Sequence, residues 1–312
     1  EKCFTTGKGS SFNGDIWLNH VATFSITNCF ISNKITNFIL ELLSNINIKK
    51  PIIADCTASI GGNSMSFIRK FSKTISIEID MSTHGLLKRN LELVRNKLDI
   101  KNTFKTLCDS YNGEKAVSYI HPSQGAKRDG YPDVLFFDPP WGGANINYSL
   151  YKKNRMNIDK IKLGGKTMDD VVIDMKTDTD NIKYSVLKLP YVYNYKTLKK
   201  NIEKKDTLGK INLKKIKAYY VVVKDLVYDI IRIKHYKKEI HGKKKMMIIV
   251  VKYNKFMTMP KPSIKSPNAV NGPLPETKQT RVPEVVKKKT GVEDNSRGDD
   301  DAPQAQQVTQ VQ

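Results

Sequence analysis

The chain has 312 residues, of which 39% are hydrophobic and 9% aromatic, enough for one large or two small folded cores. Its 53 Lys and Arg residues outnumber its 31 Asp and Glu residues, and the net charge of +22 favours a polyanionic partner such as nucleic acid. Four cysteines without CxxC spacing and five scattered histidines argue against a zinc site and a disulfide framework, and no apolar run reaches the length of a membrane span.

Short apolar runs alternate with helical patterns through the middle of the chain. We expect strands at 51–57, 74–80, 103–109, 133–140 and 183–190, helices at 63–72 and 84–98, and a closing antiparallel hairpin from 227–236 and 246–253. This alternation predicts an α/β, Rossmann-like fold with a mostly parallel sheet. Ligands of such sheets bind beyond the carboxyl ends of the strands.

The last part of the chain has a different composition. Residues 256–312 hold seven of the 13 prolines, and their eight Lys and Arg residues nearly balance seven Asp and Glu residues. We therefore predict a disordered tail there, with the positive charge carried by the folded part. The remaining chain divides into a folded domain at 51–255 and a segment at 1–50 that covers substrate and cofactor.

Acidic residues follow three successive predicted strands. The first strand leads into "ADCTASIGGNS", with Asp55 at its end and two glycines before the next helix; the other strands end in Glu78 and Asp80, and in Asp109. Acids at these places suit ribose hydroxyls and an adenine amine. Neither GxGxxG nor a P-loop is present, which favours a cofactor without phosphates, and S-adenosylmethionine fits. Helix caps and an ordinary tight turn are the structural alternatives.

The stretch "FFDPPWGG" follows the fourth strand. The Asp138 carboxylate and the Pro139 carbonyl are acceptors that can be aimed at an exocyclic aromatic amine, whose lone pair is otherwise delocalised into the ring. Trp141 can stack on the base. This arrangement predicts methyl transfer to a nucleobase amine, with a Pro-rich loop around a core tryptophan as the structural alternative.

The motifs "DCTASIGGNS", "SIEID", "LCD" and "DPPWGG", in this order, resemble those of the trimethylguanosine synthase family, the cap guanine-N2 methyltransferases. The messenger-RNA adenosine methyltransferases carry DPPW before their cofactor motif, so the order argues against them. "FSITNCF" and "VLKLPYVYN" resemble the family's segment before the first strand and its fifth strand. The resemblance spans roughly residues 12–255.

The resemblance implies an S-adenosylmethionine-dependent methyltransferase fold and methylation of the 7-methylguanosine cap of RNA, without metal or membrane. It implies a cofactor site formed by Asp55, Thr57, Gly61, Gly62, Asn63, Glu78, Asp80 and Asp109. It implies catalytic roles for Asp138, Pro139 and Trp141, and substrate contacts from Trp141, Pro140 and Tyr148. The expected location is intracellular, the nucleus for a cellular protein and the host cytoplasm for a viral one.

Two positions depart from the family. Asp138 stands where well-known members have serine, and Ser59 stands where they have glycine. Asp138 keeps a second hypothesis open, in which the target is an unmodified guanine N2 or adenine N6 within RNA or DNA. A third hypothesis is a catalytically silent methyltransferase-like subunit that binds RNA.

Overall fold

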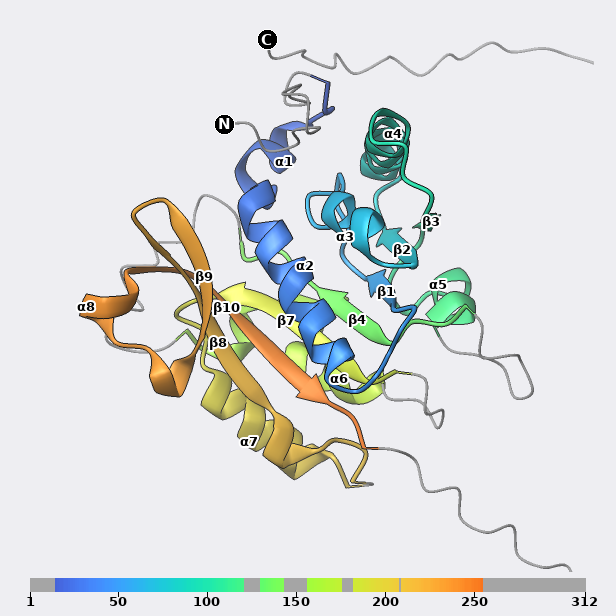
Figure 1. The fold of residues 1–312 in the computed structure, drawn as a ribbon. Helices are drawn as coiled ribbons and strands as arrows, with labels where there is room; N and C mark the ends of the chain where they lie inside the picture. The colour runs from blue at the N-terminus through green and yellow to red at the C-terminus, as the bar shows by residue number, and fades with distance from the viewer. Residues whose placement is uncertain (1–14, 121–129, 143–155, 176–181, 208, 255–312) are drawn as a thin grey trace, which may run out of the picture. The chain divides into compact units, whose positions relative to one another are not determined.

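A computed structural model describes residues 15–120, 130–142, 156–175, 182–207 and 209–254 (Figure 1). Its main feature is a single eight-stranded sheet. In sheet order the strands are β3 (Thr103–Cys108), β2 (Lys73–Glu78), β1 (Ile52–Asp55), β4 (Val134–Phe137), β7 (Tyr184–Pro190), β10 (Lys243–Lys252), β8 (Lys217–Lys224) and β9 (Val227–Arg232). A separate two-stranded sheet pairs β5 (Lys162–Leu163) with β6 (Lys166–Thr167).

The strands β3, β2, β1, β4 and β7 are mutually parallel, whereas β10 is antiparallel to both of its neighbours and β9 is antiparallel to β8. The chain order reverses between β1 and β4, where Asp55 pairs with Ser76 on one side and with Phe136 on the other. Such a reversal opens a crevice at the carboxyl ends of the strands. The predicted α/β, mostly parallel architecture is therefore confirmed.

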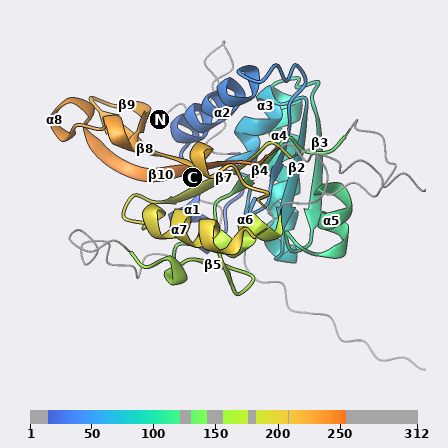
Figure 2. The same cartoon turned by 90° about the horizontal axis from the view of Figure 1, so that it is seen from below.

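Helices cover both faces of the sheet (Figure 2). The described helices are α1 (His20–Ser25), α2 (Cys29–Ser44), α3 (Ser64–Lys70), α4 (Met81–Lys97), α5 (Glu114–Ile120), α6 (Met168–Asp174), α7 (Tyr195–Lys205) and α8 (Lys238–His241), with 3-10 turns at Ile158–Lys160, Leu213–Lys215 and Ile233–His235. One apolar core joins alternate strand residues to α2 and α3, and the other joins the opposite residues to α5, α6 and α7. Burial on both faces explains why β4 is apolar without alternation and why every residue of β7 is buried.

The predicted C-terminal antiparallel hairpin is confirmed, but the sequence interpretation paired the wrong strands. Residues 227–236 do not pair with 246–253. The strand β8 separates them, because β9 pairs with one edge of β8 and β10 pairs with the other, and β10 also pairs with β7. The two-residue turn between β8 and β9 places Asp225 and Leu226 at φ 51° and 62°. This is the left-handed region, and Leu226 stands at the second turn position, where glycine usually marks such a hairpin.

Several sequence predictions are not tested by the described residues. Tyr148 and the predicted tail at 256–312 lie outside them.

Among described helices, none is long and apolar enough to cross a membrane, and no described cluster of His, Cys, Asp and Glu could hold a metal ion. Cys29 takes part in a disulfide, whereas Cys56 and Cys108 are free thiols.

Candidate active site at the carboxyl ends of β1, β4 and β7

Asp138 lies at the centre of a converging set of donors. Two prolines after it cannot donate to a sheet ladder, so β4 ends at Phe137 and the Asp138 side chain leaves the strand at the crevice. Its Oδ2 accepts from Lys188 Nζ at 2.5 Å, Asn63 Nδ2 at 3.1 Å and Thr27 Oγ1 at 3.4 Å. Among the described residues, all three side-chain donors to Asp138 therefore reach Oδ2, and none reaches Oδ1.

Lys188 is a site residue that the sequence interpretation missed. It sits within β7 in "SVLKLP", where its side chain is only 4% exposed and pairs with an Asp138 side chain that is 14% exposed. Its Nζ also donates to Thr27 Oγ1 at 2.8 Å. A lysine inside an otherwise apolar strand is the signal that could have revealed it, because buried ammonium groups are rare unless they are paired.

Trp141 packs beside this ion pair. Its Nε1 donates to the Lys188 carbonyl at 3.3 Å, and Lys188 Nζ lies 5.0 Å from the ring centroid. The indole is half-buried and contacts both apolar cores, while Pro139 is buried and Pro140 is exposed. The tryptophan is thus fixed from one side, with a part of its surface left at the crevice.

The loop after β1 is tied to the same centre. Thr57 Oγ1 accepts from the Asp138 backbone N–H at 2.6 Å, and Asn63, just before α3, contributes the Nδ2 donor described above. The other Asn63 side-chain atom, Oδ1, is buried and has no hydrogen-bond partner among the described residues. An unpaired buried acceptor is costly, so a ligand N–H or O–H would stabilise it.

The turn between β1 and α3 needs unusual backbone angles. Gly61 has φ 104°, and Ser59 has φ 48°, in the left-handed region that favours glycine. At Gly62, a side chain would collide with the N-terminal segment, and this contact explains the glycine. A Cβ there would lie 2.9 Å from Ile26 Cγ1 and 3.0 Å from the Thr27 backbone nitrogen. The N-terminal segment therefore packs directly on the glycine turn and carries Thr27 to Asp138.

Glu78 stands at the end of β2, as predicted, and organises the turn. Its Oε2 accepts from Ser59 N at 2.9 Å and its Oε1 from Asp80 N at 2.9 Å. Asp80 itself is the exposed N-cap of α4, where its hydrogen bonds with Thr83 and Ser82 lower its pKa. The structure thus gives Asp80 the helix-capping role that was the alternative to a ligand contact.

Asp109 follows β3, but its carboxylate is occupied by the adjacent loop. Oδ1 accepts from Ser110 N and Oδ2 from Ala116 N, each at 2.9 Å, so the side chain caps the first turn of α5. A Cβ at Gly113 would fall 2.0 Å from Oδ1. The glycine is therefore needed to let the loop close around the acid.

Two exposed apolar side chains near the end of β2 were not anticipated. Ile79 is 71% exposed and Met81 76%, on either side of Asp80 and next to Glu78. Exposed large apolar side chains are informative when they gather beside polar ones in a crevice. An aromatic ring bound above the ends of β1 and β2 would cover them.

Asp55 ends β1 as predicted but is fully buried. Its Oδ2 accepts from Ser64 Oγ at 2.6 Å, which in turn accepts from Ser76 Oγ at 2.9 Å. The pKa of Asp55 is raised to about 7, mainly by burial and also by the nearby Asp138, while the Ser64 hydrogen bond opposes the shift. Asp55 therefore supports the turn from beneath, and a cofactor contact from it stays a prediction.

The raised pKa of Asp55 predicts a pH-dependent stability. Below pH about 4 the Asp55 side chain is protonated in both the folded and the unfolded protein. Between pH about 4 and 7 it is ionised in the unfolded chain but still protonated in the folded protein, so the free energy of unfolding falls as pH rises. The slope for this group is at most about 1.4 kcal/mol per pH unit, and it levels off above 7. Urea unfolding between pH 5 and 8 should show a weaker decline for Asp55→Asn; equal declines would contradict the assignment.

Comparisons with known proteins place most of the chain in one family. A family model described as RNA cap guanine-N2 methyltransferase matches residues 50–254. An uncharacterized protein of Acanthamoeba polyphaga mimivirus is 29% identical over 148 residues, which cover 47% of this chain and 49% of the relative. The match thus spans about half the length of that relative.

Solved structures resemble the chain more distantly. An rRNA methylase from Streptococcus thermophilus is 9% identical with a TM-score of 0.37, covering 69% of this chain and 94% of its own. A precorrin-6y C5,15-methyltransferase from Geobacter metallireducens is 14% identical with a TM-score of 0.39, covering 76% and 93%. TrmK of M. capricolum, in complex with S-adenosylhomocysteine, is 12% identical with a TM-score of 0.35, covering 70% and 69%.

Proposed function

Because the chain belongs to the RNA cap guanine-N2 methyltransferase family, we propose that it methylates the exocyclic N2 amine of the 7-methylguanosine cap of RNA. The observation that carries the proposal is the Asp138 carboxylate, fixed through one oxygen by three donors and open through the other. The basic composition of the folded part suits a capped RNA substrate.

The cofactor of this family is S-adenosylmethionine, which supplies the methyl group when bound. The residues at the ends of β1 and β2 fit its adenosyl part. Each Glu78 oxygen accepts one backbone N–H and retains capacity for a ribose hydroxyl. Ile79 offers apolar surface for adenine, and the unpaired Asn63 Oδ1 offers an acceptor to the ligand. Gly61 and Thr57 shape the turn around it.

Asp138 would act as the acceptor for the substrate amine. Its Oδ2 is engaged by Lys188, Asn63 and Thr27, so a substrate N–H would donate to Oδ1. The negative charge near the amine stabilises the positive charge that develops on nitrogen as the methyl group is transferred. The Pro139 carbonyl is a second acceptor, because the following proline restricts the backbone there.

Trp141 would hold the plane of the base. Lys188 already lies 5.0 Å from the ring centroid, so a stacked base would take the surface turned away from that ammonium. The 7-methylguanine base is cationic, and a cation over an aromatic face gains about 0.5–2 kcal/mol beyond ordinary stacking. Pro140, exposed next to Trp141, would contact the base edge.

A second candidate function rests on Asp138 itself. Where well-known members of the resembling family have serine, this chain has an acid, which is the usual residue of enzymes that modify adenine N6 or other guanine N2 atoms. The alternative substrate is therefore an unmodified base within RNA or DNA. The two candidates differ in whether the base must carry an N7 methyl group.

Methyl transfer from labelled S-adenosylmethionine to two dinucleotide caps, one N7-methylated and one not, separates the candidates. We expect label only in the N7-methylated cap, because Trp141 favours the cationic base. Transfer to neither cap, with cofactor still bound, would refute the cap assignment and favour an internal base. Failure to bind the cofactor at all would instead support a silent RNA-binding subunit.

A further inference from the structure

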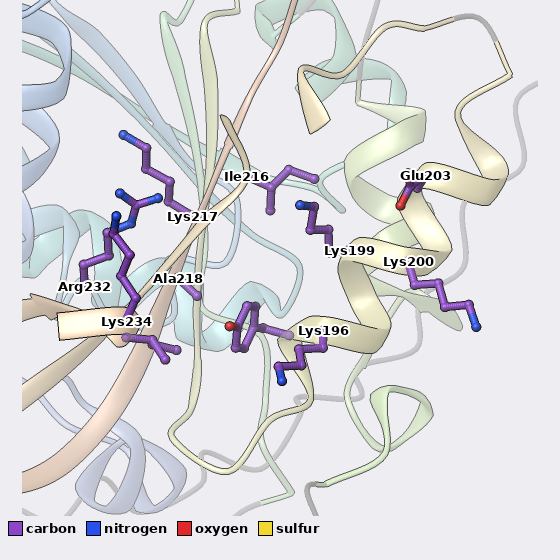
Figure 3. A pocket seen from close by; sticks show the side chains of 11 residues that line it. Lys196, Lys199, Lys200, Glu203, Ile216, Lys217, Ala218, Arg232 and Lys234 are labelled. Atoms are coloured by element: carbon purple, nitrogen blue, oxygen red, sulfur yellow. The ribbon is translucent and has the colours of Figure 1, made fainter. Parts of the chain in front are cut away.

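A basic groove is lined by α7 and by the ends of two strands, and by none of the residues of the candidate active site (Figure 3). It has a volume of about 430 Å³ and is formed by α7 together with the start of β8 and the end of β9. Its cations are Lys196, Lys199, Lys200, Lys217, Arg232 and Lys234, against a single acid, Glu203.

The cations of the groove are not neutralised by their neighbours. Within the described ranges, no side chain of the six forms an ion pair or a hydrogen bond, whereas Lys205, at the end of the same helix, is paired with Asp169 and Asp170. In Figure 3, Lys199 points from α7 toward the strands, and Lys217, Arg232 and Lys234 lie together across the strands from it.

Partial burial strengthens the repulsion among these like-charged side chains. Lys199, Lys217 and Arg232 are each half-buried. Burial lowers the pKa of Lys217, and the neighbouring charges of Arg232, Lys215 and Lys234 lower it further. Crowded like charges without counter-charges destabilise a fold, and a bound polyanion would relieve the repulsion.

The groove begins at the carboxyl edge of the sheet, where the candidate active site also lies. β7 ends at Pro190 on the carboxyl edge, and α7 starts five residues later at Tyr195 and runs back along the sheet. Val250 of β10 pairs with Val186 of β7 on one side and with Lys217 of β8 on the other, so Lys217 is level with Val186. Two strand spacings separate Lys217 from Val186 by roughly 10 Å, and Val186 lies two positions before Lys188. The groove therefore leads away from the edge where Asp138 lies.

We propose that this groove binds the phosphate backbone of the single-stranded RNA that follows the cap. The proposal rests on the proposed function, because the cap places a phosphate chain at the carboxyl edge of β7. Lysine ammonium groups neutralise phosphates without reading sequence, as one site for many transcripts requires. Tyr195, half-buried in the groove, provides an aromatic ring on which an unpaired base can stack.

The test compares a groove variant, Lys196→Glu with Lys199→Glu and Lys234→Glu, with a control of equal charge change. The control is Lys49→Glu with Lys70→Glu and Lys88→Glu, three exposed lysines outside the groove. Fluorescence anisotropy of an uncapped 20-nucleotide RNA, measured across salt concentrations, reports binding. Methyl transfer is then measured on the cap dinucleotide and on the same RNA carrying the cap.

For the groove variant we expect the plot of log affinity against log salt to lose about two units of slope, from three lost phosphate contacts. Relative to the KM for the dinucleotide, the KM for capped RNA should rise about tenfold or more, while the control stays within twofold of wild type. Equal behaviour of the two variants would overturn the proposal.

The two proposals fail in different ways. If the wild-type protein methylates no cap dinucleotide, the cap assignment fails, yet the uncapped RNA still reports on the groove. If the dinucleotide is methylated normally but the groove variant binds RNA like the control, only the groove assignment fails. Circular dichroism of each variant verifies that the fold is intact before either conclusion is drawn.

Discussion

Lys188→Met is expected to lower the free energy of unfolding by about 3–5 kcal/mol, because it leaves the Asp138 carboxylate partly buried without its counter-charge. Methionine keeps most of the length of the lysine side chain, so the loss reports the charge more than the packing. Thr27 and Asn63 would still donate to Asp138, but neutral donors compensate a carboxylate less than an ammonium group does.

The decisive comparison is a double-mutant cycle. Asp138→Asn alone leaves the Lys188 ammonium unpaired and should also destabilise, whereas Asp138→Asn with Lys188→Met removes both charges together. We expect the double variant to be more stable than either single one, as is found for buried ion pairs replaced by neutral groups. Urea unfolding of the four proteins at one pH gives the coupling free energy. Additive losses would contradict a direct Asp138–Lys188 interaction.

The ion pair also bears on the departure of this chain from its family pattern. An acid in place of serine adds a negative charge to a site that is mostly closed to water, and Lys188 supplies the balancing charge from β7. The two side chains therefore balance each other's charge within the site. A serine at 138 with Lys188 unchanged would leave an unpaired cation in the same place.

Much of the fold could be predicted from local patterns. The strand ends at Asp55, Glu78 and Asp138 are marked by apolar runs that stop at an acid, and the structure has β1, β2 and β4 ending at or directly before these residues. The alternation of such runs with amphipathic helices is enough to indicate a parallel sheet. The strands of the C-terminal hairpin were paired wrongly because its turn has Leu226 at a position where glycine usually marks a two-residue hairpin.

The site was less predictable because its contacts join distant parts of the chain. Thr27 and Lys188 are separated by 161 residues and Thr27 and Asp138 by 111, so no local pattern links them. Residue type alone was also ambiguous at Asp109. The same acid suits an adenine amine or the first turn of a helix, and only the bonds to Ser110 and Ala116 distinguish the two.

Asp138→Asn is expected to reduce kcat roughly 100- to 1000-fold, the usual effect of removing one aligned electrostatic contact at a reacting centre. The argument follows from polarity. Lys188, Asn63 and Thr27 are all donors, so they would hold the carbonyl oxygen of the new amide. Its NH2 group would then occupy the place of Oδ1 and face the substrate amine, donor against donor.

Cofactor affinity provides the control for this loss. The Asp138 backbone N–H donates to Thr57 Oγ1 regardless of the side chain, so the turn after β1 should keep its shape in the Asn variant. We expect the dissociation constant of S-adenosylhomocysteine, measured by calorimetry, to change about threefold or less. The Asp138→Asn, Lys188→Met double variant sharpens the test, since it should regain stability without regaining activity. Activity that returns together with stability, or cofactor affinity that falls as far as kcat, would make Asp138 a structural residue instead of the acceptor for the amine.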